Sequence, residues 1–192
     1  MPDCVCSWAD IAVAVLAAGQ GRRFGSDKLM ADLDGAPMGI HIARTLKRMP
    51  FGWRFAVCSK GAALVQHFSA AGFQIIENAE PETGQSRSLH LAVEAAETTD
   101  ATAMLVVLAD MPFVTSGHIE KLLDAGEGII ASTSGDRPMP PALFPRSVWP
   151  ELLRTTGDAG ARDRLQHATL VHAPASELRD IDVPADLREN PA

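Results

Sequence analysis

Apolar residues in this chain fall into short runs, and segments with helical spacing separate them. The first run, Ile11 to Ala18, carries no charge and leads into a cluster of glycines. An uncharged run of this length before glycines is typical of a parallel strand buried on both faces. Further strands are predicted at residues 54–59, 73–77, 103–109, 128–133, 142–144 and 169–172.

The segments between these runs have the periodicity of amphipathic helices. Helices are predicted at residues 38–49, 61–71, 86–96, 115–123 and 146–154, with shorter ones opening near residue 156 and at Pro184. Strands that alternate with helices favour parallel pairing through right-handed crossovers. We therefore expect an α/β protein with a mostly parallel central sheet. No repeat or linker divides residues 1–192, so we expect one domain, with residues 1–10 as a flexible tail.

Composition narrows the classes of function. The net charge of −7 argues against a general nucleic-acid binder, whose surface is basic. Only three cysteines occur and none form a CxxC pair, so a disulfide framework or a zinc site is not expected. The start of the chain lacks a signal-peptide pattern, and no apolar stretch approaches the ~18 residues of a membrane span. These features predict a cytoplasmic protein without a membrane partner.

A glycine-rich, cationic loop follows the first strand. Its glycines and cations are Gly19, Gly21, Gly25, Arg22, Arg23 and Lys28. Glycines let backbone N–H groups approach a phosphate, and the cations neutralise its oxygens. The spacing matches neither a P-loop nor a dinucleotide fingerprint. The alternative is a tight strand-to-helix turn with solvated arginines.

Carboxylates and hydroxyls stand at other strand and helix ends. Asp110 follows the most apolar strand, where α/β sheets place their ligands, although it could instead cap the turn before Pro112. Asp180 and Asp182 alternate around Ile181, so an extended segment points both the same way. Ser86 or Ser88 can cap the helix that follows Gly84. These residues are candidates for a site of nucleotide and metal binding.

Five motifs in chain order carry a resemblance to a known family. They read LAAGQGRRFGSDK, GQSRSL, DMP, GDAGAR and DIDVPADL, and together they run from about Ile11 to Leu187. The chain resembles the nucleotidyltransferases related to the molybdenum cofactor guanylyl- and cytidylyltransferases. The alanines Ala17 and Ala18 are similar to the cytidylyl branch. The resemblance implies a Rossmann-like three-layer α/β/α nucleotidyltransferase fold.

The same resemblance implies a reaction and its residues. CMP would pass from CTP to the phosphate of molybdopterin, with Mg²⁺ and release of pyrophosphate. Arg22, Lys28 and Asp110 would be catalytic, and Asp110 and Asp182 would bind the metal. The nucleotide would meet Leu16, Ala17, Ala18, Gly19, Gly21, Arg22, Lys28, Ser86 and Ser88. A molybdoenzyme or its chaperone would be a transient protein partner.

Two departures from the family pattern keep alternatives open. Asp27 stands where the family has proline, and residues 137–144 lack the glycine and histidine of the usual acceptor loop. The alternatives are a guanylyltransferase of the same fold, a transferase acting on a sugar or polyol phosphate, and a cofactor-binding chaperone without turnover.

Overall fold

The first predicted strand forms β1 (Ile11–Ala17), inside a seven-stranded sheet of order β5-β4-β1-β6-β8-β7-β9. The computed structural model describes residues 7–19, 24, 27–157 and 161–188. Every residue of β1 is buried. Side chains of Ile11, Val13 and Val15 join one apolar cluster, and those of Ala12, Ala14 and Leu16 join the other. Because successive side chains point to opposite faces, β1 contributes to both halves of the core.

Pairing is parallel from β5 through β4 and β1 to β6, and it becomes antiparallel beyond β6. β4 (Trp53–Ser59) and β6 (Ala103–Leu108) flank β1 in parallel, and β5 (Gln74–Asn78) is parallel to β4. β8 (Met139–Pro145) runs antiparallel to β6 and to β7 (Ile130–Thr133), which is parallel to β9 (Thr169–His172). The prediction of an α/β fold with a mostly parallel sheet is confirmed.

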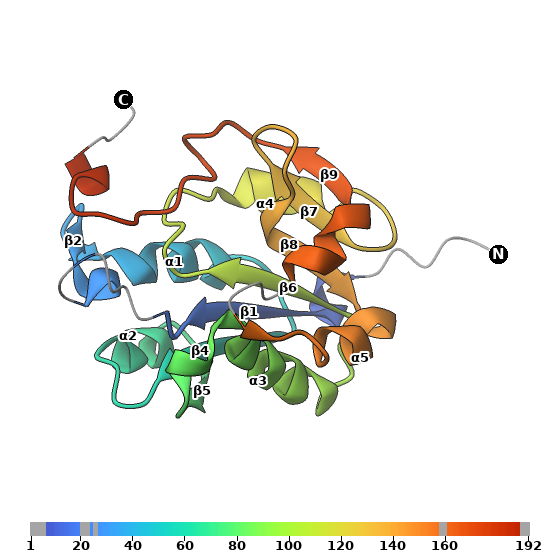
Figure 1. Cartoon of the computed structure of the whole chain (residues 1–192), viewed down its shortest axis with the longest axis horizontal. Coiled ribbons are helices and arrows are strands. Elements are labelled where there is room, and N and C mark those ends of the chain that lie inside the picture. The colour runs from blue at the N-terminus through green and yellow to red at the C-terminus, as the bar shows by residue number, and fades with distance from the viewer. Residues whose placement is uncertain (1–6, 20–23, 25–26, 158–160, 189–192) are drawn as a thin grey trace.

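Helices cover both faces of the sheet (Figure 1). α1 (His41–Lys47), α2 (Leu64–Ala70) and α4 (Ser116–Leu123) bury side chains in the first cluster. α3 (Gln85–Glu97), α5 (Trp149–Leu152) and the 3₁₀ helix η7 (Arg162–His167) bury theirs in the second. The described residues also form short 3₁₀ helices: η1 (Trp8–Asp10), η2 (Lys28–Met30), η3 (Met38–Ile40), η4 (Pro81–Thr83), η5 (Arg146–Val148) and η8 (Asp186–Arg188).

Several boundaries differ from the sequence prediction. β8 begins at Met139 rather than residue 142, because Met139 pairs with Ser132 across a register shift in β7. Residues 32–37 form a small hairpin of β2 (Asp32–Leu33) and β3 (Ala36–Pro37), and its two turn residues, Asp34 and Gly35, have positive φ. Residues 1–6 of the predicted tail lie outside the described residues, whereas Ser7 caps η1 and Trp8 packs on the core.

Among the helices formed by residues 7–19, 24, 27–157 and 161–188, none is both long enough and apolar enough to traverse a bilayer.

Candidate nucleotide and metal site

The carboxyl ends of β1 and β6 lie side by side and frame the candidate site. Leu16 of β1 pairs with Leu108 of β6, which places Ala18 and Asp110 at the same sheet edge. Ala17 and Ala18 are buried, and Ser59 donates a hydrogen bond of 3.3 Å to the Ala18 carbonyl. Beyond them Gly19 is exposed, with open space where a Cβ would stand. The backbone after β1 is therefore held in place yet accessible to a ligand.

Lys28 bridges two carboxylates that are remote from it in the chain. Its Nζ lies 2.9 Å from Asp110 Oδ2 and 2.9 Å from Asp182 Oδ1, in contacts that span 82 and 154 residues. The Lys28 side chain is 9% exposed, against 26% for Asp110 and 51% for Asp182. The structure thus brings together three of the residues that the sequence singled out.

Electrostatics explain why Lys28 stays charged there. Burial opposes the ammonium, but attraction to Asp110 and the hydrogen bonds to Asp182 and Asp110 together raise the pKa of Lys28 above its ordinary value. At neighbouring Asp180 the surroundings favour the neutral form of the side chain instead. Burial first, and then the charges of Asp182 and Asp110, raise the pKa of the Asp180 carboxyl. The carboxyl groups of Asp110, Asp180 and Asp182 therefore outnumber the single ammonium of Lys28.

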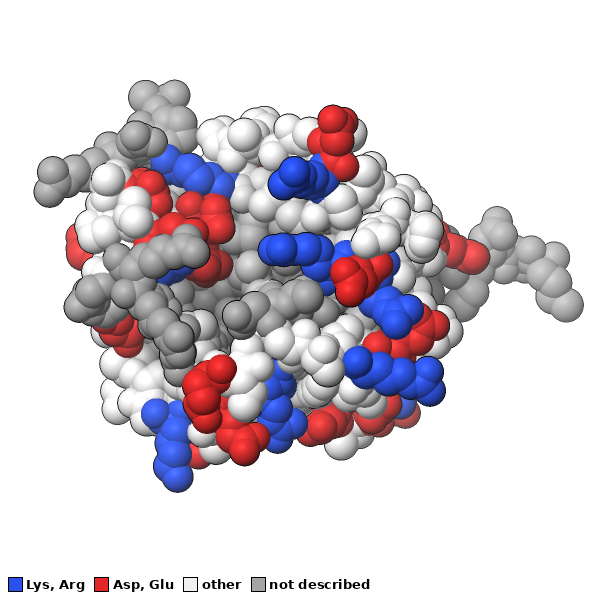
Figure 2. Space-filling view, in the orientation of Figure 1, with Lys and Arg blue, Asp and Glu red and all other residues white. Residues whose placement is uncertain are grey.

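The backbone at Asp182 is held by two sets of hydrogen bonds. The Ile181 amide donates to the Asp110 carbonyl at 3.0 Å, which ties the two acidic segments together. The amides of Asp182 and Val183 donate to Asp186 Oδ2 at 2.8 and 2.9 Å, and these bonds lower the pKa of the Asp186 carboxyl. Acidic side chains gather at the upper left of Figure 2, on the side where the C-terminal segment runs in Figure 1.

The chemistry of these groups fits a divalent cation. Within the described part of the chain, the buried Asp110 Oδ1 has no hydrogen-bond partner, and the Lys28 ammonium already stands as a cation between the two acids. Those residues contain no group of three or more His, Cys, Asp or Glu placed to hold an ion by themselves. Two carboxylates completed by phosphate oxygens and waters match the way Mg²⁺ is held. Asp110 and Asp182 would supply the carboxylates.

Ser86 and Ser88 lie in the first turn of α3 but do not cap it. The N-cap is Gly84 and makes no side-chain cap bond, so the prediction of a serine cap is wrong. The glycine, at φ 103, adopts a conformation that side chains disfavour. Both serines are buried instead, and Ser88 Oγ accepts a 3.0 Å hydrogen bond from Asn78 Nδ2.

Asn78 was missed by the sequence analysis. It ends β5 fully buried, and its Oδ1 accepts from the Glu80 amide at 2.9 Å. A polar residue at the carboxyl end of a parallel strand was the available signal, the same signal that selected Asp110. Asn78 joins the end of β5 to the start of α3 and so positions the loop between them.

The structure describes only part of the predicted phosphate loop. Gly21 and Arg22 lie outside the described residues, as do Arg23 and Gly25. Asp27, the departure beside the phosphate loop, is the N-cap of η2, and its carboxylate accepts from the Leu29 amide at 3.2 Å. This local bond accounts for an acid next to Lys28.

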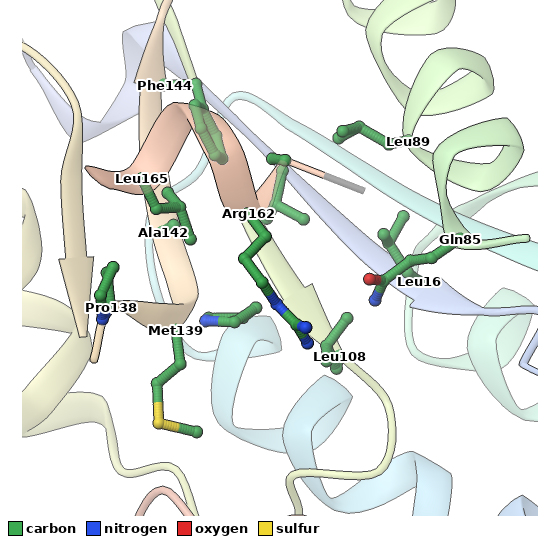
Figure 3. Close-up of a pocket in the computed structure, with 13 residues that line it drawn as sticks. Leu16, Gln85, Leu89, Leu108, Pro138, Met139, Ala142, Phe144, Arg162 and Leu165 are labelled. Atoms are coloured by element: carbon green, nitrogen blue, oxygen red, sulfur yellow. The ribbon is translucent and has the colours of Figure 1, made fainter. Parts of the chain in front are cut away.

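A cavity opens at the same sheet edge, between α3, β6 and β8 (Figure 3). Leu16 and Leu108 line it, each two residues before Ala18 and Asp110. Arg162, from the late GDAGAR motif, and Gln85, the first residue of α3, both extend toward its middle. The cavity therefore adjoins the site of Lys28 and the two acids.

Comparison with known proteins supplies the family. Residues 13–173 match the MobA-like NTP transferase domain. The chain belongs to this family of nucleotidyltransferases. The purine catabolism protein PucB of Bacillus subtilis is 29% identical over 188 residues, which cover 89% of this chain and 91% of PucB. The MobA-like assignment thus rests on most of the chain.

Two other relatives match over part of their length. A probable molybdenum cofactor guanylyltransferase of Pyrococcus horikoshii is 30% identical, covering 59% of this chain and 55% of that protein. A 2-C-methyl-D-erythritol 4-phosphate cytidylyltransferase of Bacillus velezensis is 30% identical, covering 62% and 53%. The names of these two relatives therefore differ in both nucleotide and acceptor.

Solved structures confirm the nucleotidyltransferase fold. A nucleotidyl transferase from Methanothermobacter superposes with a TM-score of 0.71 at 20% identity, covering 92% of this chain and 93% of that one. The Mycobacterium tuberculosis Rv0371C complex with manganese superposes with a TM-score of 0.76 at 20% identity, covering 94% and 97%. The Rossmann-like α/β arrangement predicted from the motifs is thus confirmed.

Proposed function

We propose that this protein transfers CMP from CTP to the phosphate of molybdopterin, with release of pyrophosphate. The observation that carries the proposal is the meeting of Lys28, Asp110 and Asp182 at the carboxyl ends of β1 and β6. In α/β sheets this edge is where ligands bind. One cation between two acids suits a reaction of a metal-bound triphosphate.

The reaction needs positioning and neutralisation of charge more than covalent help from the protein. An oxygen of the acceptor phosphate attacks the α-phosphorus of CTP, and the bond from that phosphorus to the bridging oxygen of pyrophosphate breaks. A divalent cation, Mg²⁺ or Mn²⁺, supplies Lewis-acid polarisation of the phosphoryl group when bound. Asp110 and Asp182 would hold it, and the manganese complex of the structural neighbour supports such a cation.

Lys28 then has a second role. With Asp110 and Asp182 holding a divalent cation, the Lys28 ammonium would be available to neutralise the negative charge of the triphosphate. Preorganised cations aimed at developing charge are the main catalytic device in such sites. Arg22, predicted beside it, would share this task.

CTP is favoured by the motifs, and a guanylyl reaction is the second candidate. Ala17, Ala18 and the GQSRSL and GDAGAR motifs resemble the cytidylyl branch, and one relative is a cytidylyltransferase. The Pyrococcus relative is a probable guanylyltransferase, which supports GTP as the alternative. Molybdopterin as acceptor is supported by the resemblance and by that same relative.

The test is a screen of four nucleoside triphosphates with and without molybdopterin, reading pyrophosphate release with Mg²⁺ and with EDTA. We expect product with CTP, molybdopterin and Mg²⁺ together. Asp110→Asn should lower turnover by about 10²–10³-fold while the folded state is retained. Turnover with GTP instead of CTP contradicts the cytidylyl assignment, and tight binding without pyrophosphate indicates a cofactor carrier.

A further inference from the structure

Residues 35–76 contain no acidic side chain. This stretch, between Asp34 and Glu77, carries five Lys or Arg residues. Because the whole chain has a net charge of −7, the other 150 residues together carry −12. A patch of one charge sign on a protein of the opposite sign raises the local concentration of complementary partners. Outside the predicted phosphate loop, this stretch is therefore the part of the chain best suited to an anionic partner.

Three of these cations form one face of α1, which we call the α1 basic face: Arg44, Lys47 and Arg48. Residues three and four positions apart are neighbours on a helix surface. All three residues are exposed, whereas Ile42 and Leu46 of the same helix are buried in the first cluster. Within the described part of the chain, none of the three cations forms an ion pair or a side-chain hydrogen bond. The protein's own carboxylates therefore leave this face charged and accessible.

The stability of α1 does not account for three clustered cations. Cations near a helix C-terminus interact favourably with its last carbonyl groups. Arg54 already serves this end of α1, since its guanidinium donates a 2.6 Å hydrogen bond to the Met49 carbonyl. Arg44 is three positions from Lys47 and four from Arg48, and like charges at these spacings oppose helix formation. An anionic partner would relieve that repulsion.

The end of α1 lies far from the candidate metal site. The helix returns along the sheet from the carboxyl end of β1 to its amino end (Figure 1). Just beyond it, the Gly52 amide donates to the carbonyl of Ile11, the first residue of β1, whereas Lys28 and Asp110 lie past the other end of that strand. A strand of seven residues spans about 20 Å. The α1 basic face is therefore not placed to act on the triphosphate.

We propose that the α1 basic face binds an acidic segment of another protein, rich in Asp and Glu. Guanidinium groups pair with carboxylates through two parallel hydrogen bonds, which suits Arg44 and Arg48. In an extended segment, every second side chain points the same way, about 7 Å from the next. Cations whose Cβ atoms lie about 5–6 Å apart can reach carboxylates at that spacing. Binding there leaves the candidate site open.

Other anionic occupants fit this face less well. A nucleic acid would bring its many phosphates against the −12 carried by the rest of the chain. A bilayer would need apolar anchors beside the cations, but the exposed large apolar residues in the described ranges, Leu170 and Val183, lie outside α1. A second copy could meet the face only with a different, acidic surface. Such head-to-tail contacts give rings or open filaments rather than a two-fold dimer.

The experiment measures binding of a fluorescein-labelled octaglutamate peptide to the full chain by fluorescence anisotropy. The test variant replaces all three cations of the α1 basic face with Gln. The matched control replaces three exposed cations that lie on separate parts of the fold: Lys60→Gln, Lys121→Gln and Arg164→Gln. Both variants have the same net charge. We expect the test variant to weaken binding about tenfold, the sum of three exposed ion pairs, and the control less than about twofold.

Further measurements separate this face from the candidate site and from other occupants. Pyrophosphate release and Tm in the test variant should match those of the wild type, and added NaCl should weaken peptide binding. Absence of peptide binding to the wild type, or equal weakening in both variants, overturns the inference. Tighter binding of a DNA oligonucleotide or of phosphatidylserine vesicles than of the peptide assigns the face to that class instead. Self-association in sedimentation that the test variant alone abolishes assigns it to a second copy.

Discussion

Lys28 links the parts of the candidate site at the residue scale. It is a buried ammonium that balances Asp110 and Asp182, each at 2.9 Å. A charge pair in such a place is stable only while both signs are present, since removing one partner leaves the other uncompensated. The position of Lys28 therefore makes the carboxylates depend on a cation, either the lysine or a metal ion.

A substitution of Lys28 tests this dependence. We expect Lys28→Met to lower the free energy of unfolding by about 1–2 kcal/mol without metal, because two partly exposed carboxylates lose their counter-charge. Added Mn²⁺ should then raise the Tm of Lys28→Met more than that of the wild type. Calorimetry with and without Mn²⁺ measures both, and equal metal-induced shifts would exclude a cation site between the two acids.

The fold leaves no space for a side chain at Gly52. Its amide donates to the Ile11 carbonyl at 3.2 Å, and a Cβ would lie 2.1 Å from the Ala9 carbonyl oxygen. Gly52→Ala should therefore destabilise the protein by about 2 kcal/mol, since the clash is with backbone. At about 2–4 °C per kcal/mol for this chain length, the Tm falls by roughly 4–8 °C.

Gly135 offers the control. A Cβ there meets nothing within 4 Å, and Gly135→Ala should leave the Tm nearly unchanged. Equal losses in the two variants would show that conformational freedom of glycine, not the close approach to Ala9, sets the cost.

At the element scale, α4 is joined to β7 and β8 through a buried histidine. Ser132 Oγ donates to the Pro141 carbonyl at 2.8 Å, so His118 Nε2 must donate to Ser132 Oγ, also at 2.8 Å. His118 Nδ1 is then unprotonated, buried and without a partner among the described residues. Burial lowers the pKa of His118, while Glu177 raises it and Lys121 lowers it to smaller extents. The neutral ring is therefore the native form.

This histidine predicts a dependence of stability on pH. A base whose pKa is depressed on folding stabilises the native state above its unfolded pKa of 6.5, and that contribution is lost as pH falls below 6.5 and through the native value. The Tm difference between pH 7.5 and 5.5 should therefore be smaller in His118→Asn than in the wild type. An unchanged difference would assign the acid sensitivity to carboxylates.

The segment from Glu177 to Asp182 is tied to the end of β6. Glu177 Oε1 accepts from both the amide and the hydroxyl of Thr115, and the Arg179 guanidinium lies 4.8 Å from the centre of the Phe113 ring. With the Ile181–Asp110 backbone bond, these contacts set the position of Asp182 relative to Asp110. Glu177 is thus a positioning residue for the proposed metal site.

Loss of the Glu177 carboxylate should weaken metal binding. We expect Glu177→Ala to reduce Mn²⁺ affinity about tenfold, in the range found for groups that orient ligands. Glu177→Gln, which keeps an acceptor oxygen for Thr115, should restore most of it, and Glu82→Ala, at an exposed surface position, should have no effect. Titration followed by electron paramagnetic resonance measures the affinity. Equal affinity in all four proteins contradicts the positioning role.

At the scale of the whole molecule, β1 couples the two apolar clusters. Its alternating side chains enter both, so neither cluster is complete without the strand. We therefore expect one cooperative unfolding transition, as the prediction of a single domain requires. Tryptophan fluorescence, which reports Trp8 on one cluster and Trp53 and Trp149 on the other, should coincide with far-ultraviolet circular dichroism. Two separate transitions would show independently stable halves.

Local sequence determined the elements and the candidates for the site. The uncharged run before the glycines predicted β1, and the position directly after the most apolar strand singled out Asp110. Both predictions were possible because a strand buried on both faces is a continuous apolar run in the sequence. Motif resemblance reached further and selected Lys28 and Asp182. Gly21 and Arg22, outside the described residues, remain predictions.

Tertiary structure alone decided how these pieces meet. The antiparallel direction of β8, the bond between Asn78 and Ser88, and the place of Lys28 between two acids all depend on the path of intervening loops. Lys28 is 82 positions from Asp110 and 154 positions from Asp182 in the sequence. No local pattern can therefore indicate their contact. Packing against the shared sheet brings Lys28, Asp110 and Asp182 to one edge, because each of them lies in a segment that follows a different strand.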